Sequence, residues 1–181
     1  MSAAHANSGN AGTAPTGAAP LRILVLCTGN SARSQIAEAL LATRGAGRLV
    51  AASAGSRPVA QVNPYAVEVL RAHGIEWTGR VPKSVDEVAD ERFDLVVTVC
   101  DHARDACPVL PGAPAQAHWG LPDPADETEP FAARRAFAAT FDALAARIDA
   151  LLAQPLERLD PATLRERAQA IGVAHQVTSM P

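Results

Sequence analysis

The sequence is poor in charged and aromatic residues, which make up 19% and 4% of its 181 residues. Its formal net charge of -3 gives no long-range attraction to nucleic acid or to an anionic membrane, so we expect neither as a partner. No apolar run approaches the length of about 20 residues that a membrane span needs. Any anion that the chain binds must therefore be held by a local site.

Cysteine is scarce too, with only Cys27, Cys100 and Cys107 in the chain. Residues 1–20 are mainly alanine, glycine, serine, threonine and proline, and they lack the basic start and apolar centre of a secretion signal. We interpret them as a disordered tail and expect the protein to be cytoplasmic. Because that compartment is reducing, structural disulfides are not expected, and the reactivity of the thiols becomes the question.

Apolar runs that suit buried strands alternate with segments of helical periodicity. Leu21–Leu26 and Phe93–Val99 are nearly continuous apolar runs, as in strands buried on both faces of a parallel sheet. Shorter strands are expected at 48–55 and around 115–119. The alternation predicts an α/β fold, a three-layer sandwich in which a four-stranded parallel sheet is flanked by helices.

Helices are marked by their ends or by their apolar faces. One begins near Ser34, interpreted as its N-cap, and another has Asn63 as N-cap and Pro64 at its first position. A long amphipathic helix carries apolar residues between 137 and 151, and a last helix begins at Pro161. We expect three parts in the chain: the tail 1–20, one domain over 21–153 and a helical C-terminal extension over 154–181.

The segment from Cys27 to Arg33 joins the first strand to the first helix. Such a turn aims backbone N–H groups into one concavity, to which the helix N-terminus adds partial positive charge. Gly29 and Asn30 are residue types that tolerate the positive φ such a turn needs, and Arg33 is expected to hold two oxygens of a tetrahedral oxyanion. The predicted oxyanion-binding residues are Thr28, Gly29, Asn30, Ser31, Ala32, Arg33 and Ser34.

Cys27 faces this anion as a predicted nucleophile. We expect the positive field to lower the pKa of its thiol, and Ser34 to donate a hydrogen bond to the sulfur. The loop lacks the Gly-Lys-Ser/Thr ending of nucleotide-binding loops, so ATP or GTP is not implied. The alternative is that Cys27 is only a small buried residue and Arg33 a surface residue, which their placement between strand and helix disfavours.

Two stretches carry a family resemblance, which covers residues 21–152. CTGNSARSQIAEALL resembles the phosphate loop and first helix of the low-molecular-weight protein tyrosine phosphatase fold. VVTVCDHARDACPVLPGAPAQAHWGLPDPAD is most similar to the thioredoxin-coupled arsenate reductases of that superfamily. In it Cys100 ends a strand and Cys107 follows, and phosphatases of this fold have no chemical use for these two cysteines.

The resemblance implies a redox relay at one oxyanion site that binds arsenate or phosphate. Cys27 attacks arsenate, Cys100 attacks Cys27 and releases arsenite, and Cys107 then attacks Cys100. Reduction of arsenate to arsenite takes two electrons, which the formation of one disulfide supplies. Thioredoxin is the expected reductant of that disulfide, although glutaredoxin or mycothiol serves some relatives. The resemblance also implies Asp123 as the general acid, and no cofactor is expected.

If the segment between Cys100 and Cys107 is helical, it has to unwind or loop out when the disulfide forms. Seven residues of helix rise roughly 10 Å, whereas the Cα atoms of a disulfide lie within about 7 Å of each other. Pro108 and the polar residues of the segment favour such mobility.

A potassium site is known in some arsenate reductases, at residues that match Asn30, Glu38 and Ser53. Its remaining aspartate aligns here with Lys83 or Ser84, and a lysine ammonium can replace the cation. We therefore predict no metal, and the histidines of the chain show no metal-ligand spacing.

Two other functions compete with the reductase. A phosphatase acting on phosphotyrosine or a small phosphoester would use the same loop and Asp123, but Ala125 stands where such phosphatases have a tyrosine after the Asp-Pro pair. Weak phosphatase activity is still expected from the shared loop. A non-catalytic oxyanion or redox sensor is disfavoured by the intact set of catalytic residue types.

His118 and Trp119 are interpreted as packing residues.

Overall fold

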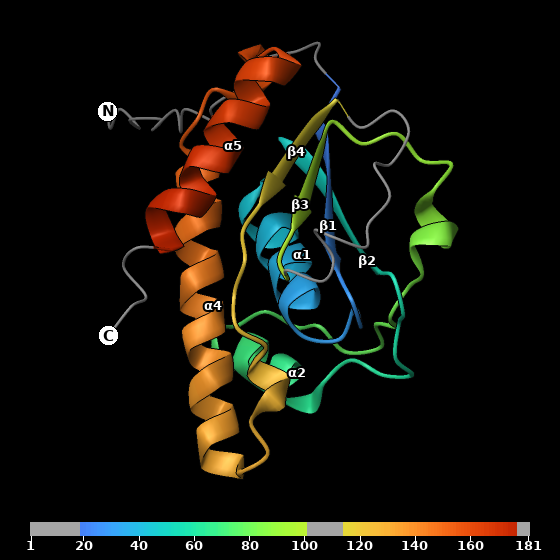
Figure 1. The fold of residues 1–181 in the computed structure, drawn as a ribbon, viewed down its shortest axis with the longest axis vertical. Helices are drawn as coiled ribbons and strands as arrows, with labels where there is room; N and C mark the ends of the chain where they lie inside the picture. Colours follow the sequence, from blue (N-terminus) through green and yellow to red (C-terminus); the bar gives the residue numbers. More distant parts are fainter. Residues whose placement is uncertain (1–18, 101–113, 177–181) are drawn as a thin grey trace, which may run out of the picture.

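The computed structural model of the protein describes residues 19–100 and 114–176. Four parallel strands form one sheet in the order β2-β1-β3-β4 (Figure 1). The strands are β1 Leu21–Cys27, β2 Leu49–Gly55, β3 Leu95–Thr98 and β4 Ala115–His118. The helices are α1 Arg33–Arg44, α2 Pro64–Ala72, α4 Pro130–Leu152 and α5 Pro161–Gln176, and short 3-10 turns span η1 Val85–Val88, η2 Pro124–Asp126 and η3 Leu156–Arg158.

The inner strand β1 is buried on both faces. Ile23, Leu24, Val25 and Leu26 are each at most 1% exposed. One face packs through Ile23 and Val25 in a core with α1, α2 and α4, and the other packs through Leu24 and Leu26 against η1 and Phe93. The predicted α/β fold with a four-stranded parallel sheet is therefore confirmed, and β1 carries its loop out of the centre of the molecule.

The start of α1 differs from the prediction. The helix begins at Arg33, Ala32 occupies the N-cap position, and no side chain caps the helix. Ser34 lies inside the first turn, fully buried, with its Oγ 2.9 Å from the sulfur of Cys27. The prediction of Ser34 as the N-cap is wrong, because its hydroxyl bonds to the cysteine rather than to the helix end.

Most other element ends follow the prediction. The Asn63 side chain accepts a hydrogen bond from the first turn of α2, in which Pro64 is the first residue. The Asp160 carboxylate accepts from two backbone N–H groups at the start of α5. Strand β3 is shorter than the apolar run Phe93–Val99, because its pairing with β1 extends only over Leu95–Thr98.

The two last helices lie along one edge of the sheet, where α5 packs against β4 and α4 (Figure 1). Among the described residues, no helix is both long and apolar enough to cross a membrane. Two predictions fall outside these residues. They are the tail, apart from its last two positions, and the segment that follows Cys100 and contains Cys107.

Candidate active site

The site is built where β1 and β3 end side by side. Cys27 is the last residue of β1, and Cys100 follows the end of its neighbour β3. Both residues are only 4% exposed. Thr28 links them, because its Oγ1 lies 3.5 Å from the Cys100 sulfur. The structure thus places two thiols around one loop, as expected for parallel strands whose carboxyl ends share an edge.

The backbone of the loop is held from outside by the segment 56–63. Four loop carbonyls accept hydrogen bonds of 2.9 to 3.2 Å from N–H groups of this segment, and they belong to Cys27, Thr28, Gly29 and Ser31. A carbonyl and the N–H of the same peptide unit point in opposite directions, so the N–H groups of the loop turn away from 56–63. One of them, that of Asn30, donates to the Cys27 sulfur at 3.0 Å.

Positive φ, which the sequence indicated for this turn, occurs at Asn30. Asn30 has a φ of 50°, whereas Gly29 is not in the left-handed region. The glycine that the loop needs is Gly55, at the end of β2. A Cβ there would lie 2.5 Å from the Thr28 carbonyl oxygen, so only glycine lets β2 approach the loop this closely.

The Cys27 sulfur has two directed donors. Besides the Asn30 N–H, the Ser34 hydroxyl lies 2.9 Å away, as the sequence predicted. The Asn30 side-chain amide donates to the Ser34 oxygen at 2.9 Å. That bond occupies one lone pair of the oxygen, and when Cys27 is a thiolate only the Ser34 hydroxyl can donate in the contact between them. A thiolate at Cys27 would therefore meet two hydrogen-bond donors already in place.

Burial nevertheless raises the pKa of the Cys27 thiol above its usual value. The hydrogen bonds from Ser34 and the Asn30 N–H lower this pKa, but they do not outweigh the loss of solvent. The Cys100 thiol raises it further, and the Arg33 charge lowers it only slightly. The predicted net lowering of the pKa is therefore wrong, because the sequence does not show how deeply the strand end is buried.

Arg33 is buried and faces a segment distant in the sequence. Its Nη1 donates to the Leu121 carbonyl at 2.8 Å, and its Nη2 forms an ion pair with the Asp123 carboxylate. Arg33 is 7% exposed, and within the described residues its Nε has no hydrogen-bond acceptor. The structure thus brings Asp123 to the loop and leaves one buried guanidinium donor unused.

Residues 22–167 match the family described as low molecular weight phosphotyrosine protein phosphatase. The chain belongs to this family. An arsenate reductase of Halalkalibacterium halodurans is 40% identical over 103 residues, which are 57% of this chain and 73% of that protein. The family and the fold that the sequence predicted are therefore confirmed, and the match ends within α5.

Solved structures of the same fold include two arsenate reductases. One, described as an arsenate reductase in the phosphate binding state, has a TM-score of 0.64 at 25% identity, covering 74% of this chain and 97% of that chain. The thioredoxin-dependent arsenate reductase of Corynebacterium glutamicum has a TM-score of 0.53 at 30% identity, covering 76% of this chain and 66% of that chain.

The loop of this family member continues into a buried polar network. The Asn30 amide also donates to Ser53 Oγ at 2.8 Å, and Ser53 donates to the Glu38 carboxylate at 2.5 Å. Lys83 is the last member of this network. Its Nζ lies 3.6 Å from Glu38 Oε2, and its backbone N–H donates to the Asn30 side-chain oxygen. Of the two residues that the sequence left open for this position, Lys83 is thus the one whose ammonium lies beside Glu38.

Three features of the site were missed at the level of sequence. They are the segment 56–63, the close approach at Gly55 and the Leu121 carbonyl that holds Arg33. Each works through the backbone, which side-chain types do not report, although the glycine at the end of a predicted strand is a signal in retrospect. Trp119 packs as predicted, since the residue is 1% exposed, whereas His118 is half-buried and its Nδ1 lies 2.8 Å from Thr98 Oγ1.

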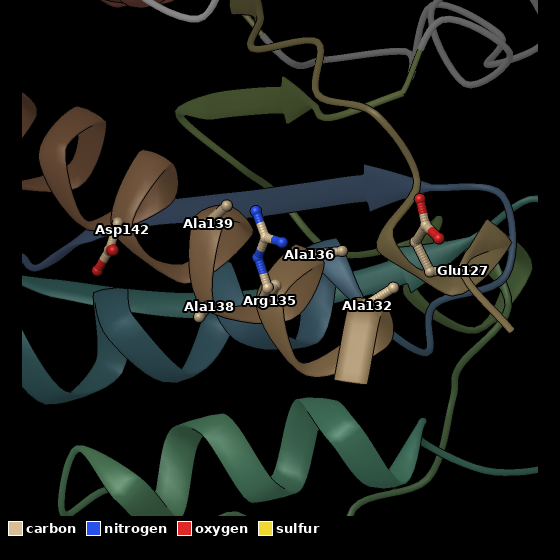
Figure 2. A pocket seen from close by; sticks show the side chains of 7 residues that line it. All are labelled: Glu127, Ala132, Arg135, Ala136, Ala138, Ala139 and Asp142. Carbon is tan, nitrogen blue, oxygen red and sulfur yellow. The ribbon is translucent and has the colours of Figure 1, made fainter. Parts of the chain in front are cut away.

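A groove of about 570 Å³ lies along the first half of α4, and none of the predicted site residues lines it (Figure 2). Its lining residues are Glu127, Ala132, Arg135, Ala136, Ala138, Ala139 and Asp142. The groove is therefore distinct from the loop that surrounds Cys27.

Proposed function

We propose that the protein reduces arsenate to arsenite by a relay of thiols that starts at Cys27. The observation that carries this proposal is the placement of Cys27 and Cys100 at the ends of neighbouring strands, with Thr28 touching the second sulfur. Hydrolysis of a phosphoester needs one nucleophilic thiol, whereas a two-electron reduction needs two. The similarity to proteins named arsenate reductases supports the same choice.

The loop is suited to a tetrahedral oxyanion. Its carbonyls are tied to 56–63, so its N–H groups remain for the anion, and they lie at the N-terminus of α1. Within the described residues the Arg33 Nε has no acceptor, which supports a role for Arg33 in binding the oxyanion. A solved relative described as being in the phosphate binding state is consistent with such a site.

The first step joins sulfur to arsenic. The Cys27 thiolate, with Ser34 and the Asn30 N–H as donors, attacks arsenic and forms an S–As bond while one oxygen leaves as water. Asp123, beside Arg33, is placed to give that oxygen its proton. Arsenic remains in the +5 state after this exchange of ligands.

The second and third steps move the electrons. The Cys100 thiolate attacks the Cys27 sulfur and forms a disulfide, and the electron pair of the S–As bond stays on arsenic, which leaves as arsenite. Cys107 then attacks the Cys100 sulfur, forms the Cys100–Cys107 disulfide and frees Cys27 as a thiolate. This last step is proposed from the presence of Cys107 seven residues after Cys100.

A thioredoxin is the proposed source of the two electrons that regenerate the enzyme, in agreement with the name of the Corynebacterium glutamicum relative. Exchange between a dithiol and the Cys100–Cys107 disulfide returns both thiols and oxidises the partner. The reducing cytoplasm is the compartment in which this cycle can run.

The test is arsenate-dependent oxidation of NADPH in the presence of thioredoxin and thioredoxin reductase. We expect turnover by the wild-type protein, none by Cys100→Ser, and retained weak hydrolysis of p-nitrophenyl phosphate by the same variant, because hydrolysis needs only Cys27. An absence of arsenate-dependent turnover in the wild type, combined with rapid phosphotyrosine hydrolysis, would favour the phosphatase and overturn the proposal.

A further inference from the structure

The C-terminal helix α5 makes a close and specific contact with the end of β4 (Figure 1). Gly172 faces His118 and Trp119, and a Cβ at this glycine would lie 2.3 Å from the His118 carbonyl oxygen and 2.7 Å from Trp119 Cδ1. Any side chain larger than hydrogen would force the two backbones apart. The glycine therefore sets the distance between α5 and the strand.

Two hydrogen bonds join the same surfaces. The Trp119 indole N–H donates to the Ala168 carbonyl at 2.8 Å, and the His118 backbone N–H donates to the Gln169 side chain at 3.0 Å. The Trp119 N–H bonds to β3 at Thr98, so the N–H of the preceding residue points outward from this edge strand. Helix α5 provides an acceptor for this His118 N–H through the Gln169 side chain. Both Gln169 and Gly172 lie beyond the family match, which ends at residue 167.

The strand that α5 holds leads directly to the partners of Arg33. Beyond Trp119 the chain passes Leu121, whose carbonyl accepts from Arg33, and reaches Asp123, whose carboxylate pairs with the same guanidinium. Both terminal nitrogens of Arg33 are thus bonded to the short segment 119–123. A shift of Trp119 moves these acceptors, and the guanidinium moves with them.

We propose that Trp119 is a positioning residue that α5 holds in place, so that the segment 119–123 fixes Arg33 for oxyanion binding. This inference rests on the proposed function, because it assumes that Arg33 binds the oxyanion. It gives the C-terminal extension a role at the site without contact between α5 and the substrate. The Cys27 donors Ser34 and Asn30 are not bonded to the segment 119–123, so this coupling acts mainly on anion affinity, and the two hydrogen bonds to the sulfur stay in place.

The test uses inorganic phosphate as the probe and the full-length protein. Cys27 is alkylated with iodoacetamide, its modification is followed by peptide mass spectrometry, and the phosphate concentration that halves the rate is measured. We expect this concentration to rise about tenfold in Gly172→Ala and about threefold in Trp119→Phe, because small displacements of binding groups weaken their contacts steeply. The rate without phosphate should stay within about twofold of the wild-type rate, because the donors to the sulfur are not displaced.

Ala170→Val is the matched control, since residue 170 lies on the exposed side of α5. In this variant, the phosphate concentration that halves the alkylation rate of Cys27 should equal that of the wild type. If both Gly172→Ala and Trp119→Phe are protected like the wild type, the inference is wrong while the proposed function stands. If phosphate and arsenate fail to protect even the wild type, the oxyanion site itself is wrong and both proposals fall. A purely structural role for Trp119 would lower the melting temperature without changing the phosphate requirement, and that result also contradicts the inference.

Discussion

Two buried arginines in different regions of the molecule have opposite surroundings. Arg33, at the carboxyl edge of the sheet, gives both terminal nitrogens to acceptors on the segment 119–123. Arg147, on the buried side of α4, is 1% exposed and bonds through Nη1 to the Ala143 carbonyl of its own helix. Within the described residues, its Nε and Nη2 have no acceptor. Burial also lowers the pKa of the Arg147 guanidinium.

The difference separates a buried charge at the proposed oxyanion site from one that has little compensation among the described residues. Burying a guanidinium is expensive unless its donors are paired. At Arg33 an ion pair and a carbonyl offset much of that cost, and within the described residues only Nε lacks an acceptor. At Arg147 no comparable compensation is present among the described residues. Substitutions at the two positions should therefore act on different properties, activity at the first and stability at the second.

The largest expected effect is at Arg33. Arg33→Lys keeps the charge but loses the planar fork that reaches Leu121 and Asp123 together. We expect kcat/KM for arsenate to fall by about 100-fold or more, as when a directed donor to a developing charge is removed. Steady-state kinetics in the thioredoxin-coupled assay measure this change.

The control for this variant is Arg44→Lys, on the same helix. Arg44 bonds through one nitrogen to the exposed Asp149 carboxylate, so its loss should leave kcat/KM near the wild-type value. If kcat/KM falls equally in the two variants, the effect is not specific to Arg33, and the role assigned to Arg33 is contradicted.

Ser34→Ala tests the donors on the nucleophile. The pKa of the Cys27 thiol is already raised by burial, and removal of the Ser34 hydrogen bond raises it further. Less thiolate is then present at neutral pH, so alkylation by iodoacetamide at pH 7 should slow by about tenfold, the worth of one hydrogen bond to a charged group. In both proteins the rate rises with pH, and the midpoint of the variant should lie at higher pH. Thr43→Ala, which removes an exposed hydroxyl from α1, should keep the wild-type profile, and an unshifted Ser34→Ala profile would contradict the assignment of Ser34 as a donor.

The two regions also differ in how far sequence reasoning reaches. Between Cys27 and Ser34 the residue types, their order and their place between strand and helix were enough to predict the loop between strand and helix and the contact of Ser34 with Cys27. This was possible because the interactions lie within one local segment, whose geometry is fixed by a strand end and a helix start. The alternation of apolar runs likewise predicted the parallel sheet, since buried strands have a distinct pattern.

Two kinds of property were not predictable in this way: those set by how deeply a residue is buried, and contacts with backbone groups far away in the sequence. The raised pKa of Cys27 follows from burial under segments that are distant in the sequence, and the pairing of Arg33 with Leu121 joins positions 88 residues apart. Asp123 was found through family resemblance, because an Asp-Pro pair alone is also a common turn. No sequence pattern marked Arg147 as buried, since an arginine on an amphipathic helix is usually exposed.

Lys83 and Glu38 form a charge pair of intermediate character, in which the Lys83 side chain is half-buried and the Glu38 side chain is buried. The Lys83 ammonium lies 3.6 Å from Glu38, which is 5% exposed and also accepts from Ser53. Lys83→Met leaves that carboxylate with less compensation, and we expect the free energy of unfolding to fall by about 1–2 kcal/mol in urea denaturation. Arg134→Met removes the exposed pair with Glu68 and should change stability by less than about 0.5 kcal/mol. If both variants lose the same amount, the Lys83 ammonium does not stabilise the polar network.

The smallest expected effect, of opposite sign, is at Arg147. Arg147→Met replaces an underpaired buried guanidinium with an unbranched apolar side chain that can follow the same path. We expect the free energy of unfolding to rise by about 1 kcal/mol, because the desolvation cost of the charge is removed and only the bond to Ala143 is lost. Arg135→Met, on the exposed side of α4, should leave stability unchanged, and kcat/KM should be unaffected in both variants. A loss of stability in Arg147→Met would mean that the guanidinium is better compensated than its described contacts indicate, and the contrast with Arg33 would then rest on function alone.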